Sequence, residues 1–586
     1  MNGNLMTFGL ALLVAQAACA AGRVFWVDNV RGDDAAAGDA GRPYRTFARA
    51  LEVLDGGDEL HLVANAEPYC EQLRLTARHS GSADAPTRVF GHGATIDGRH
   101  AVASSDWRDE GDGVHSCILD NNAWPMNEVG RWCGSFPIVW FDGKAGRNAE
   151  TRTSLAEGGY FLRLRPKTPE HKRIYVRLPK GRTPADVRIE VPGANVNCVL
   201  SGCSHVEVRD LKVRHQTWDC FSTNYSTNCL IDHVDGSYAM DQGISSHSSV
   251  GVQVRNSVFH HNAGGGIVDV NVPGCPLCAV TYESCSVVSN CFRCPVEFYG
   301  RLYGCADIPT SRGEFTLRNC RVADNDLSRA DGSSIRQDAR AYVRVCCSTV
   351  EGKIPAQALK VMSYNIRHGE GMDRRLDLRR TAAAIAAERP HVVALQEVDV
   401  GTERVRGVDT LAELARLTGL TGRFAKAIDY AGGQYGVAIL SDVAPLSVRS
   451  VPLPGVEPRV LLMAEFDAVT VATTHLDLDE RCRLESVKAI AAEIERSAKP
   501  VILCGDWNSK PDSSVLAALG QTVKVVSRTD CGTFHGPDEG ARGECIDYIA
   551  VDGRHARRFE ARDRRVIPDE RTSDHKPIVV TLVEGN

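Results

Sequence analysis

Polar side chains that could carry out chemistry stand at the ends of apolar runs in the C-terminal part of the chain. HVVALQE ends in Glu397, VTVATTHLD carries His475 near its end, and VILCGDWN carries Asp506 and ends in Asn508. For one residue alone, such as His475, a structural role in the core is the simpler interpretation. A series of such groups at separate strand ends is hard to explain as core, and it predicts a catalytic site.

Further segments add groups of the same kinds. LKVMSYN ends in Asn365, YGVAILS begins with Tyr435, and CIDYIAV carries Asp547. TSDHKPIVV contributes Asp574 and His575. The full set combines carboxylates, imidazoles, amides and a phenol, which are the residue types of acid–base and metal-assisted catalysis.

Alternating strands and amphipathic helices must position these groups. The segment EGKIPAQA, residues 351–358, is a short polar linker with one proline. After it, the sequence pattern changes to alternating strands and amphipathic helices. LKVMSYN and HVVALQE are expected as strands, and DLRRTAAAIAAERP as a helix that stops at Pro390. We expect residues 359–586 to form a separate domain of the α/β class.

The motifs of this domain, taken together, resemble the endonuclease/exonuclease/phosphatase superfamily of deoxyribonuclease I-like, metal-dependent hydrolases. They are YN at 364–365, QE at 396–397, TH at 474–475, GDWN at 505–508, IDYI at 546–549 and SDH at 573–575. The resemblance implies a two-sheet sandwich with its site at the top of the sheets. Because the superfamily includes nucleases, sphingomyelinases and inositol polyphosphate phosphatases, it implies a phosphodiesterase or phosphatase acting on a phosphate ester.

The resemblance also implies a metal cofactor, Mg²⁺ or Mn²⁺. Such a hard cation takes oxygen ligands and keeps several waters, so one or two carboxylates and an amide suffice. Glu397 is the best ligand, and Asn365 and Asp574 are expected to complete the metal environment directly or through water. The metal would polarise a phosphoryl oxygen and stabilise the leaving alkoxide.

Two arrangements could supply the base that activates the attacking water. In one, Asp506 is the base and Asn508 fixes the phosphate or the water. In the other, the base is His575, kept basic by a hydrogen bond to Asp547. His475 and Tyr435 are expected to stabilise charge on the non-bridging phosphate oxygens. The sequence leaves the choice of base open.

The substrate is less well defined. Loops that carry Arg404, Arg406 and Arg542 could bind phosphate groups, although solvated surface charge is the simpler interpretation. The formal net charge of −6 argues against a whole-molecule electrostatic grip on nucleic acid. Nucleic acid therefore stays open as a substrate but is not indicated by charge.

The first half of the chain contains an internal repeat. HVEVRDLKV, CLIDHV, VQVRNSVF, VTYESCSV, FTLRNCRV and VRVCCSTV align at Val208, Ile231, Val254, Tyr282, Leu317 and Val345. Each unit is too short to bury its own apolar face, so neighbouring units must stack. The repeat predicts a parallel β-solenoid.

The start of this half resembles secreted right-handed parallel β-helix proteins of the pectin-lyase-like class. The similar features are Val27-Asp28, Gly32-Asp33-Asp34, GRPYRTFARAL, Gly57-Asp58 and Tyr69. We expect an all-β domain over residues 21–350, with a helix at Thr46 to Leu54 that caps the open end. The resemblance indicates fold better than function, because this class includes lyases, hydrolases and binding surfaces.

Asp and His residues on adjacent coils could bind calcium or abstract a proton from a sugar. They are Asp219, Asp232, His233, Asp241, His247, His260, His261 and Asp269, beside Trp218. We favour the interpretation that they are turn and ladder residues, since no spacing among them identifies a lyase base.

The chain has 21 cysteines, sixteen of them between Cys70 and Cys347. In an exported protein they indicate disulfides or stacked buried thiols. Cys275, Cys278, Cys291 and Cys294 have the spacing of zinc knuckles, which we consider the weaker alternative.

The N-terminus predicts export. An apolar stretch from Leu5 to Ala18 precedes Ala18-Cys19-Ala20, so residues 1–20 read as a signal peptide and the protein as secreted or periplasmic. A buried N-terminal helix or strand is the alternative. No other window is apolar over the roughly 18 residues that a membrane span needs.

Two accounts of the whole chain follow. In the favoured one, an exported phosphoesterase is localised by a β-helix that binds a glycan or a cell surface. In the other, the β-helix is itself a carbohydrate-active lyase or hydrolase and the phosphatase domain is accessory.

Overall fold

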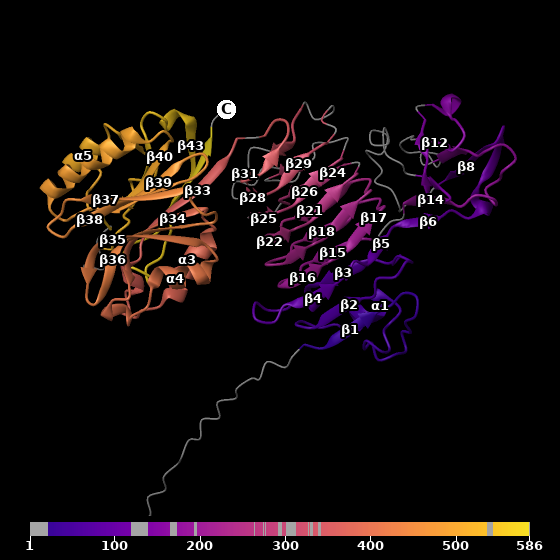
Figure 1. The fold of residues 1–586 in the computed structure, drawn as a ribbon, viewed down its shortest axis with the longest axis horizontal. Helices are drawn as coiled ribbons and strands as arrows, with labels where there is room; N and C mark the ends of the chain where they lie inside the picture. Colours follow the sequence, from indigo (N-terminus) through magenta and orange to yellow (C-terminus); the bar gives the residue numbers. More distant parts are fainter. Residues whose placement is uncertain are drawn as a thin grey trace, which may run out of the picture. The chain divides into compact units, whose positions relative to one another are not determined.

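The chain folds into two compact units, Met1–Pro355 and Ala356–Asn586, in a computed structural model (Figure 1). The structure describes residues 22–584 except 119–138, 150, 164–172, 193–195, 263, 273–274, 276, 291–295, 300–311, 326, 328–331, 338–340, 355 and 536–542. The predicted signal peptide lies outside the described residues. The export prediction therefore stays a prediction.

Parallel strands of the first unit form three long sheets. Sheet 1 contains β1 (Val24–Val27), β2 (Glu59–Leu62), β4 (Thr87–Phe90), β16 (Val206–Arg209), β19 (Leu230–Asp232), β22 (Val250–Arg255), β25 (Leu277–Glu283), β28 (Arg312–Arg318) and β31 (Ala341–Cys346). Sheet 2 contains β3 (Leu73–Thr76), β15 (Cys198–Ser201), β18 (Phe221–Asn224), β21 (Gln242–His247), β24 (Gly265–Val270), β27 (Val296–Tyr299) and β30 (Ile335–Gln337). Sheet 3 contains β5 (Thr95–Asp97), β17 (Lys212–Arg214), β20 (Asp235–Ser237), β23 (Val258–His260), β26 (Ser286–Val288), β29 (Arg321–Ala323) and β32 (Thr349–Val350). The chain visits the sheets in turn, as a parallel β-helix does.

The register of sheet 1 confirms the repeat read from the sequence. Val208 pairs with Ile231, Ile231 with Val254, Val254 with Tyr282, Tyr282 with Leu317, and Leu317 with Val345. All of these side chains except Val345 are fully or almost fully buried. The repeat works because each coil covers the apolar row of the coil before it.

A short helix covers the first coil, as the sequence predicted. Helix α1 (Phe47–Val53) begins after Thr46, whose hydroxyl oxygen accepts a hydrogen bond from the backbone N–H of Arg49. Phe47 and Ala50 are completely buried, and the ring of Phe47 stacks on Tyr69. The cap therefore closes the apolar interior at this end.

Asparagines form a ladder inside the solenoid. The side-chain Nδ2 of Asn262 donates to Oδ1 of Asn290 at 3.0 Å, and Nδ2 of Asn290 donates to Oδ1 of Asn325 at 3.2 Å. The backbone N–H groups of Asn262 and Asn290 donate to the same two oxygens. The Oδ1 atoms of Asn290 and Asn325 thus accept hydrogen bonds from the asparagine of the preceding coil. Because their polar groups are paired in this way, the side chains can be buried inside the solenoid.

A small, mostly antiparallel subdomain interrupts the solenoid between β5 and β15, and the sequence analysis did not predict it. One of its sheets contains β6 (Arg99–Ala101), β9 (Trp140–Phe141), β10 (Lys144–Ala145) and β14 (Ile189–Pro192). The other contains β7 (Arg108–Gly111), β8 (Val114–Ile118), β11 (Arg147–Asn148), β12 (Gly159–Arg163) and β13 (Arg173–Arg177). Trp140 meets His215 of the solenoid edge-on, with ring centroids 4.7 Å apart. The repeat analysis missed the insertion because it began only at His205.

Three of the Asp and His residues noted on adjacent coils lie in different surroundings. Asp269 lies inside the solenoid and accepts hydrogen bonds from the hydroxyl of Tyr282. Asp232 pairs with Arg209, and His261 stacks on Tyr238. These placements agree with turn and ladder roles.

The described cysteines are all free thiols, and most of those in the solenoid are buried in its core. Cys198, Cys220, Cys278 and Cys285 belong to the continuous apolar cluster of the coils. Cys291 and Cys294 of the alternative zinc site lie outside the described residues. Among the described residues, therefore, the stacked-thiol interpretation fits.

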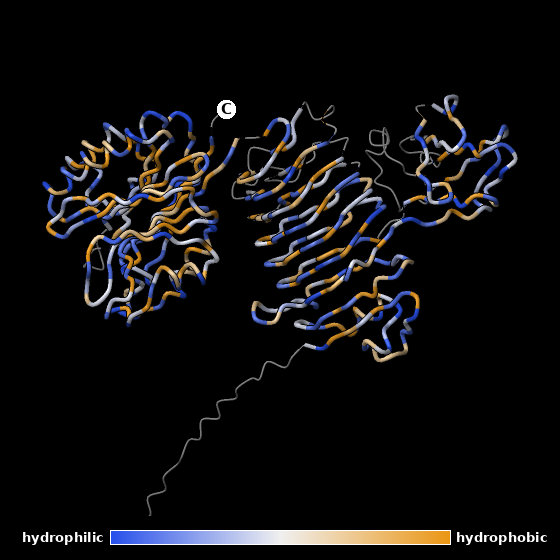
Figure 2. The backbone as a smooth tube through the Cα atoms, in the orientation of Figure 1, coloured by the Kyte–Doolittle hydropathy of each residue, from blue (hydrophilic) through white to orange (hydrophobic). Residues whose placement is uncertain are grey.

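The second unit is a sandwich of two mixed sheets. One sheet contains β33 (Ala358–Asn365), β34 (Val392–Val400), β35 (Thr421–Tyr430), β36 (Gly433–Ser441), β43 (Phe559–Val566) and β44 (Ile578–Glu584). The other contains β37 (Ser447–Leu453), β38 (Arg459–Glu465), β39 (Thr470–His475), β40 (Val501–Asp506), β41 (Val523–Val525) and β42 (Asp547–Asp552). Hydrophobic segments run along these strands in Figure 2.

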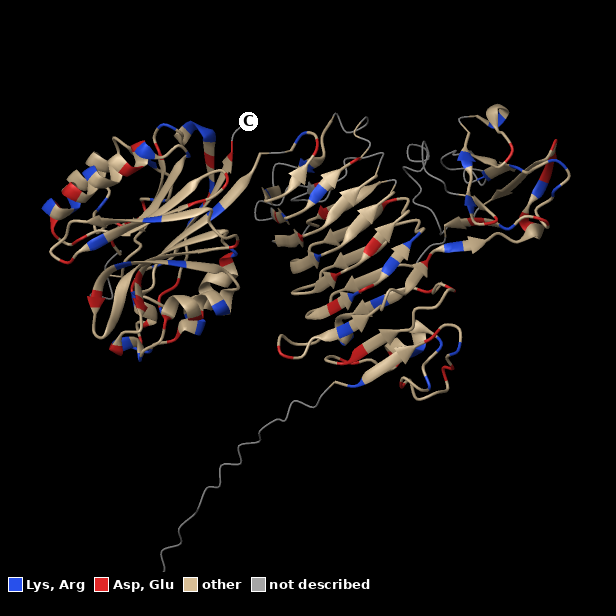
Figure 3. Ribbon diagram, in the orientation of Figure 1, with Lys and Arg blue, Asp and Glu red and all other residues tan. Residues whose placement is uncertain are grey.

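Helices cover the outer faces of the sandwich. α3 (Leu378–Glu388) and α4 (Thr410–Thr418) share a core with β33 and β34, whereas α5 (Glu480–Arg496) and α6 (Ser514–Leu519) pack on β39 and β40. A third core, which includes Val361, Ile439 and Ile549, lies between the sheets. Charged residues of both signs alternate along the exposed side of α5 (Figure 3). This is the α/β two-sheet sandwich predicted from the sequence.

No described helix is long and apolar enough to cross a membrane.

Candidate active site

Strand ends bring polar side chains of the two sheets together. Asn365 ends β33, His475 ends β39 and Asp506 ends β40. β39 and β40 are parallel with His475 directly opposite Asp506. Gly505 (φ 152°) allows this, because a Cβ there would lie 2.1 Å from the carbonyl oxygen of Thr474. The structure therefore assembles the site at one edge of the sandwich.

Two of the residues reach the site differently from the sequence prediction. Glu397 lies inside β34, not at its end, where a β-bulge between Leu395 and Val398 gives it a left-handed φ of 56°. Asp547 is the first residue of β42. Because β42 runs antiparallel to β40, its start lies beside the end of β40, and Asp547 pairs with Asp506.

One side-chain atom, Nδ2 of Asn365, contacts three of the predicted groups. It donates to Glu397 Oε1 at 2.9 Å and to Asp506 Oδ2 at 3.1 Å, and it lies 3.5 Å from His575 Nε2. The Asn365 oxygen accepts from the backbone N–H of Arg367. Burial raises the pKa of Glu397, although the hydrogen bond from Asn365 acts in the opposite direction.

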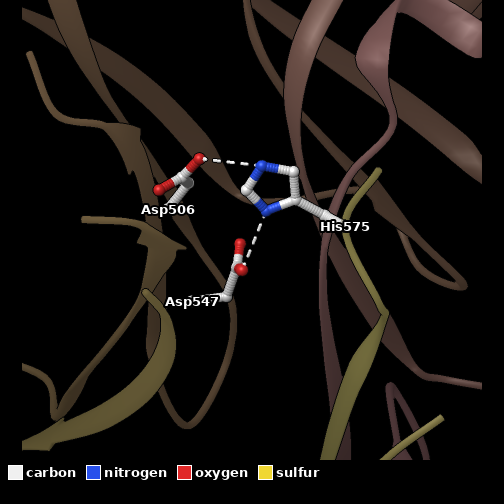
Figure 4. Close-up of side chains that lie close together, drawn as sticks. All are labelled: Asp506, Asp547 and His575. Carbon is white, nitrogen blue, oxygen red and sulfur yellow. Dashed lines mark hydrogen bonds and ion pairs between the residues drawn. The ribbon is translucent and has the colours of Figure 1, made fainter. Parts of the chain in front are cut away.

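His575 lies between two carboxylates, as Figure 4 shows. Its Nδ1 is 2.9 Å from Asp547 Oδ2 and its Nε2 is 3.5 Å from Asp506 Oδ2. Burial alone would lower the pKa of His575, but Asp547 and Asp506 outweigh it and raise the pKa to about 10. Asp547 thus fixes the orientation of the ring and directs Nε2 toward Asp506.

His475 and Tyr435 form a second, uncharged pair. The Tyr435 hydroxyl is 3.4 Å from His475 Nδ1. Burial lowers the pKa of His475 to about 4, and it raises the pKa of Tyr435. Both groups are therefore neutral near pH 7 and able to donate hydrogen bonds without a change of charge.

Asn508 closes the end of β40. Its backbone N–H donates to Asp506 Oδ1 at 3.0 Å, and its Nδ2 donates to the carbonyl of Leu476 at 2.8 Å. Its φ of 46° is left-handed, a conformation that asparagine tolerates better than most residues. The backbone N–H of Asn508 therefore helps to fix the orientation of the Asp506 carboxylate.

The segment around Thr533 supports the dyad of Asp547 and His575, and the sequence analysis missed it. The buried Thr533 hydroxyl oxygen accepts from the backbone N–H groups of Ile546 and Asp547, each at 3.1 Å. The Thr533 carbonyl accepts from the N–H of Lys576, and the ring of Phe534 packs 4.9 Å from that of His575. The only sequence signal was an aromatic residue and a histidine between glycines in GTFHG.

The remaining predicted residues lie around this centre. Asp574 is partly exposed, with Oδ2 3.5 Å from Arg367 Nε. Arg404 forms a bidentate pair with the buried Asp399. Arg406 is exposed at the end of η5 (Glu403–Val405), and Arg542 lies outside the described residues. Substrate binding by Arg406 and Arg542 stays a prediction.

The donor set fits a divalent cation. Ligand atoms of Asp506, Asp547 and His575 lie within 4.8 Å of one another. Asp547 Oδ1 is buried without a hydrogen-bond partner among the described residues. Glu397 adds a further carboxylate across Asn365, so the site is rich in the oxygen ligands that Mg²⁺ and Mn²⁺ prefer.

Comparison with known families agrees with this geometry. Residues 362–575 match the model of the Endonuclease/Exonuclease/phosphatase family. The matched segment contains every predicted residue of the site. None of the curated proteins matches the chain.

Several solved structures align with about two-fifths of the chain. An endonuclease/exonuclease/phosphatase family protein from Bacteroides thetaiotaomicron has 19% identity and a TM-score of 0.34, and the alignment covers 40% of this chain and 100% of that one. An endonuclease/exonuclease/phosphatase from Beutenbergia cavernae has 22% identity and a TM-score of 0.33, covering 39% and 72%. A mannosyl-6-phosphatase from Bacteroides thetaiotaomicron has 18% identity and a TM-score of 0.31, covering 38% and 99%.

Proposed function

We propose that this endonuclease/exonuclease/phosphatase domain hydrolyses a phosphate ester with the help of a divalent cation, Mg²⁺ or Mn²⁺. The supporting observation is that Asn365 Nδ2 contacts Glu397, Asp506 and His575 at once, at 2.9, 3.1 and 3.5 Å. A metal ligand, a carboxylate and a base within reach of one atom are what in-line attack of water on phosphorus requires.

Glu397, Asn365 and Asp574 would hold the cation, so that Asp506 and Asp547 stay paired with His575 beside it. As oriented here, Asn365 presents nitrogen to the carboxylates, so ligation through its Oδ1 requires the amide to turn over and to release the N–H of Arg367. When bound, the cation polarises the phosphoryl oxygen and lowers the energy of the leaving alkoxide.

His575 is the better of the two candidate bases. In the metal-free protein Asp547 and Asp506 raise its pKa and keep the ring protonated, and a bound cation would offset those negative charges and free Nε2 to accept a proton. Asp547 occupies its Nδ1 at 2.9 Å, which leaves Nε2 facing the centre of the site to take a proton from water. Asp506 accepts hydrogen bonds from Asn365 Nδ2 and from the backbone N–H of Asn508. These bonds suit a residue that positions other groups of the site. His475 and Tyr435, both neutral, would donate to the non-bridging oxygens of the phosphate.

Two wider proposals concern the whole chain. The apolar N-terminal stretch with Ala18-Cys19-Ala20 supports export to the periplasm or the exterior. The β-helix fold is compatible with binding a glycan or a cell surface, a role that the sequence resemblance alone supports.

The test uses the full-length protein with Mg²⁺ or Mn²⁺. The substrates are an aryl phosphodiester, an aryl phosphomonoester, a hexose phosphate, plasmid DNA and sphingomyelin. Activity on one class that disappears in EDTA and in Glu397→Gln, but not in the exposed control Glu495→Gln, supports the proposal. A folded protein that binds the metal and leaves all five substrates intact contradicts it for these classes.

A further inference from the structure

Arg404 is held rigidly at the rim of the site. Its Nε and Nη2 donate to the two oxygens of Asp399 at 2.7 and 2.8 Å, and Asp399 is completely buried. The guanidinium also packs on two rings, 4.7 Å from the centroid of Tyr430 and 5.5 Å from that of Tyr435. Among the described residues, no hydrogen bond engages Nη1. An arginine fixed in this way presents one donor edge at little further cost in entropy.

His368 adds a second polar atom beside Arg404. It lies in η4 (Arg367–Gly369), it is 8% exposed, and no described residue makes a hydrogen bond to its Nδ1. His368 and the preceding Arg367 both have a left-handed φ, 46° and 43°. Adjacent non-glycine residues in this conformation are strained, and such strain is concentrated at functional sites.

Both groups adjoin the reaction centre. Asp399, which fixes Arg404, is two residues beyond Glu397 and pairs in register with Tyr435. The Tyr435 hydroxyl is 3.4 Å from His475. His368 is three residues beyond Asn365, and the charge of Arg404 acts on it directly. Arg404, Asp399 and His368 are therefore neighbours, on the side of the centre that also carries Tyr435.

We propose that Arg404 and His368 form a subsite for a second anionic group, a phosphate or a carboxylate, on the substrate. This inference rests on the proposed phosphoesterase function. The Nη1 edge of Arg404 would donate to that group, and His368 Nδ1, which is buried in this structure, would donate a further hydrogen bond once its ring turns toward the ligand. The preferred substrates are thus small compounds that carry another acidic group near the scissile phosphate.

The test is binding to the full-length protein in Mg²⁺, measured by calorimetry with three phosphonates that are not hydrolysed. Methylphosphonate has no second anion, methylenebisphosphonate has a second phosphonate, and phosphonoacetate has a carboxylate. We expect at least one of the latter two to bind about tenfold or more tightly than methylphosphonate, the usual worth of a charge-assisted hydrogen bond. Tighter binding of methylenebisphosphonate would show that a phosphate is preferred, and tighter binding of phosphonoacetate that a carboxylate is preferred.

Arg404→Met should lower the ratio of the affinity for the tighter-binding compound to that for methylphosphonate to about one. His368→Asn should lower this ratio in part. Asparagine tolerates the left-handed backbone at position 368. His368→Asn should therefore fold, and it tests the subsite even if Arg404→Met is unfolded. Arg416→Met is the matched control, because Arg416 makes a similar bidentate pair with Glu413 on the exposed side of α4. The control should keep the full preference.

Equal binding of all three phosphonates, or a preference that survives in both Arg404→Met and His368→Asn, overturns the subsite. If methylphosphonate binds and the substrate panel is hydrolysed, the proposed function stands in either case. If no phosphonate binds but the substrate panel is hydrolysed, the subsite fails alone; if no phosphonate binds and no substrate is hydrolysed, the proposed function fails as well.

Discussion

Left-handed residues occur in both units, but they serve different ends. In the β-helix, Asp210, His233, Asn256, Ser284 and Asn319 occupy the same corner of successive coils, between sheets 1 and 3, with φ between 49° and 55°. In the second unit, Arg367, His368, Glu397 and Asn508 adopt this conformation around the site. The first set recurs once per coil, whereas the second belongs to no repeat.

The same left-handed backbone therefore turns the chain in the first unit and orients side chains in the second. At the solenoid corner the bend is needed to turn the chain into the next sheet, and any small or polar residue suffices. At the site the bend directs particular side chains inward, as the bulge at Glu397 does. Side-chain identity should therefore matter little for activity in the first unit and greatly in the second.

The greatest loss of activity is expected at Glu397, the proposed metal ligand, whose backbone is left-handed. Glu397→Gln should lower kcat/KM about a thousandfold, since metal-supplied stabilisation is worth several kcal/mol. Asp269→Asn, at a fully buried carboxylate of the solenoid, should leave kcat/KM unchanged in protein that remains folded. Steady-state kinetics of both variants with a calibrated Mg²⁺ series measure the difference. Comparable losses in the two would erase the proposed contrast.

The next largest effect is expected at His575, the proposed base. His575→Asn should reduce kcat about a hundredfold, the lower end of the roughly 10²–10⁴ that a general base contributes. Asp506→Asn tests the alternative base in parallel, and His260→Asn in the solenoid is the control for loss of an imidazole. Retention of most activity by His575→Asn, with a large loss in Asp506→Asn, would assign the proton transfer to Asp506.

The pH dependence of stability gives an independent measurement of the same dyad. The pKa of His575 is raised from 6.5 to about 10 in the folded state, so its charged form stabilises the metal-free protein. That contribution is complete below about pH 6.5 and is lost as the pH rises through about 10. In EDTA, the stability difference between the parent and His575→Asn should therefore shrink over this range, as denaturant titrations would show. A difference that stays constant with pH would argue against a charged His575.

A moderate effect on stability alone is expected in the solenoid. Asn290→Ala removes the middle of the asparagine ladder and should cost about 1–3 kcal/mol, because it leaves buried partners unsatisfied. Thermal unfolding measures this loss, and phosphoesterase activity below the transition should stay at the parental level. A loss of activity in the folded variant would mean that the units are coupled.

The smallest effect is at the solenoid corner. Ser284→Gly should stabilise the protein slightly or leave it unchanged, by at most about 1 kcal/mol, since glycine adopts φ of 55° without strain. His368→Gly relieves the same kind of strain in the second unit but should still weaken phosphonate discrimination. Unchanged discrimination in His368→Gly would show that only the bend matters there.

Local patterns along the chain were enough to predict the repeat register, the capping helix and several strand ends. The spacing of Val208, Ile231, Val254 and Tyr282 predicted the pairing register, since a coil has a nearly fixed length. Thr46 marked the start of the capping helix, and the apolar runs before Asn365, His475 and Asp506 predicted strands that end at polar groups. These features depend on neighbours in the chain or on a regular period.

Which side chains meet in the site depends on long-range strand pairing. Asp547 begins its strand, and only the antiparallel pairing with β40 brings it to Asp506 and His575. The antiparallel insertion after β5, the supporting hydroxyl of Thr533, and the partnership of Arg404 with Asp399 have no periodic signal. Such contacts join residues whose distance in sequence says nothing about their distance in space, so pattern analysis could not predict them.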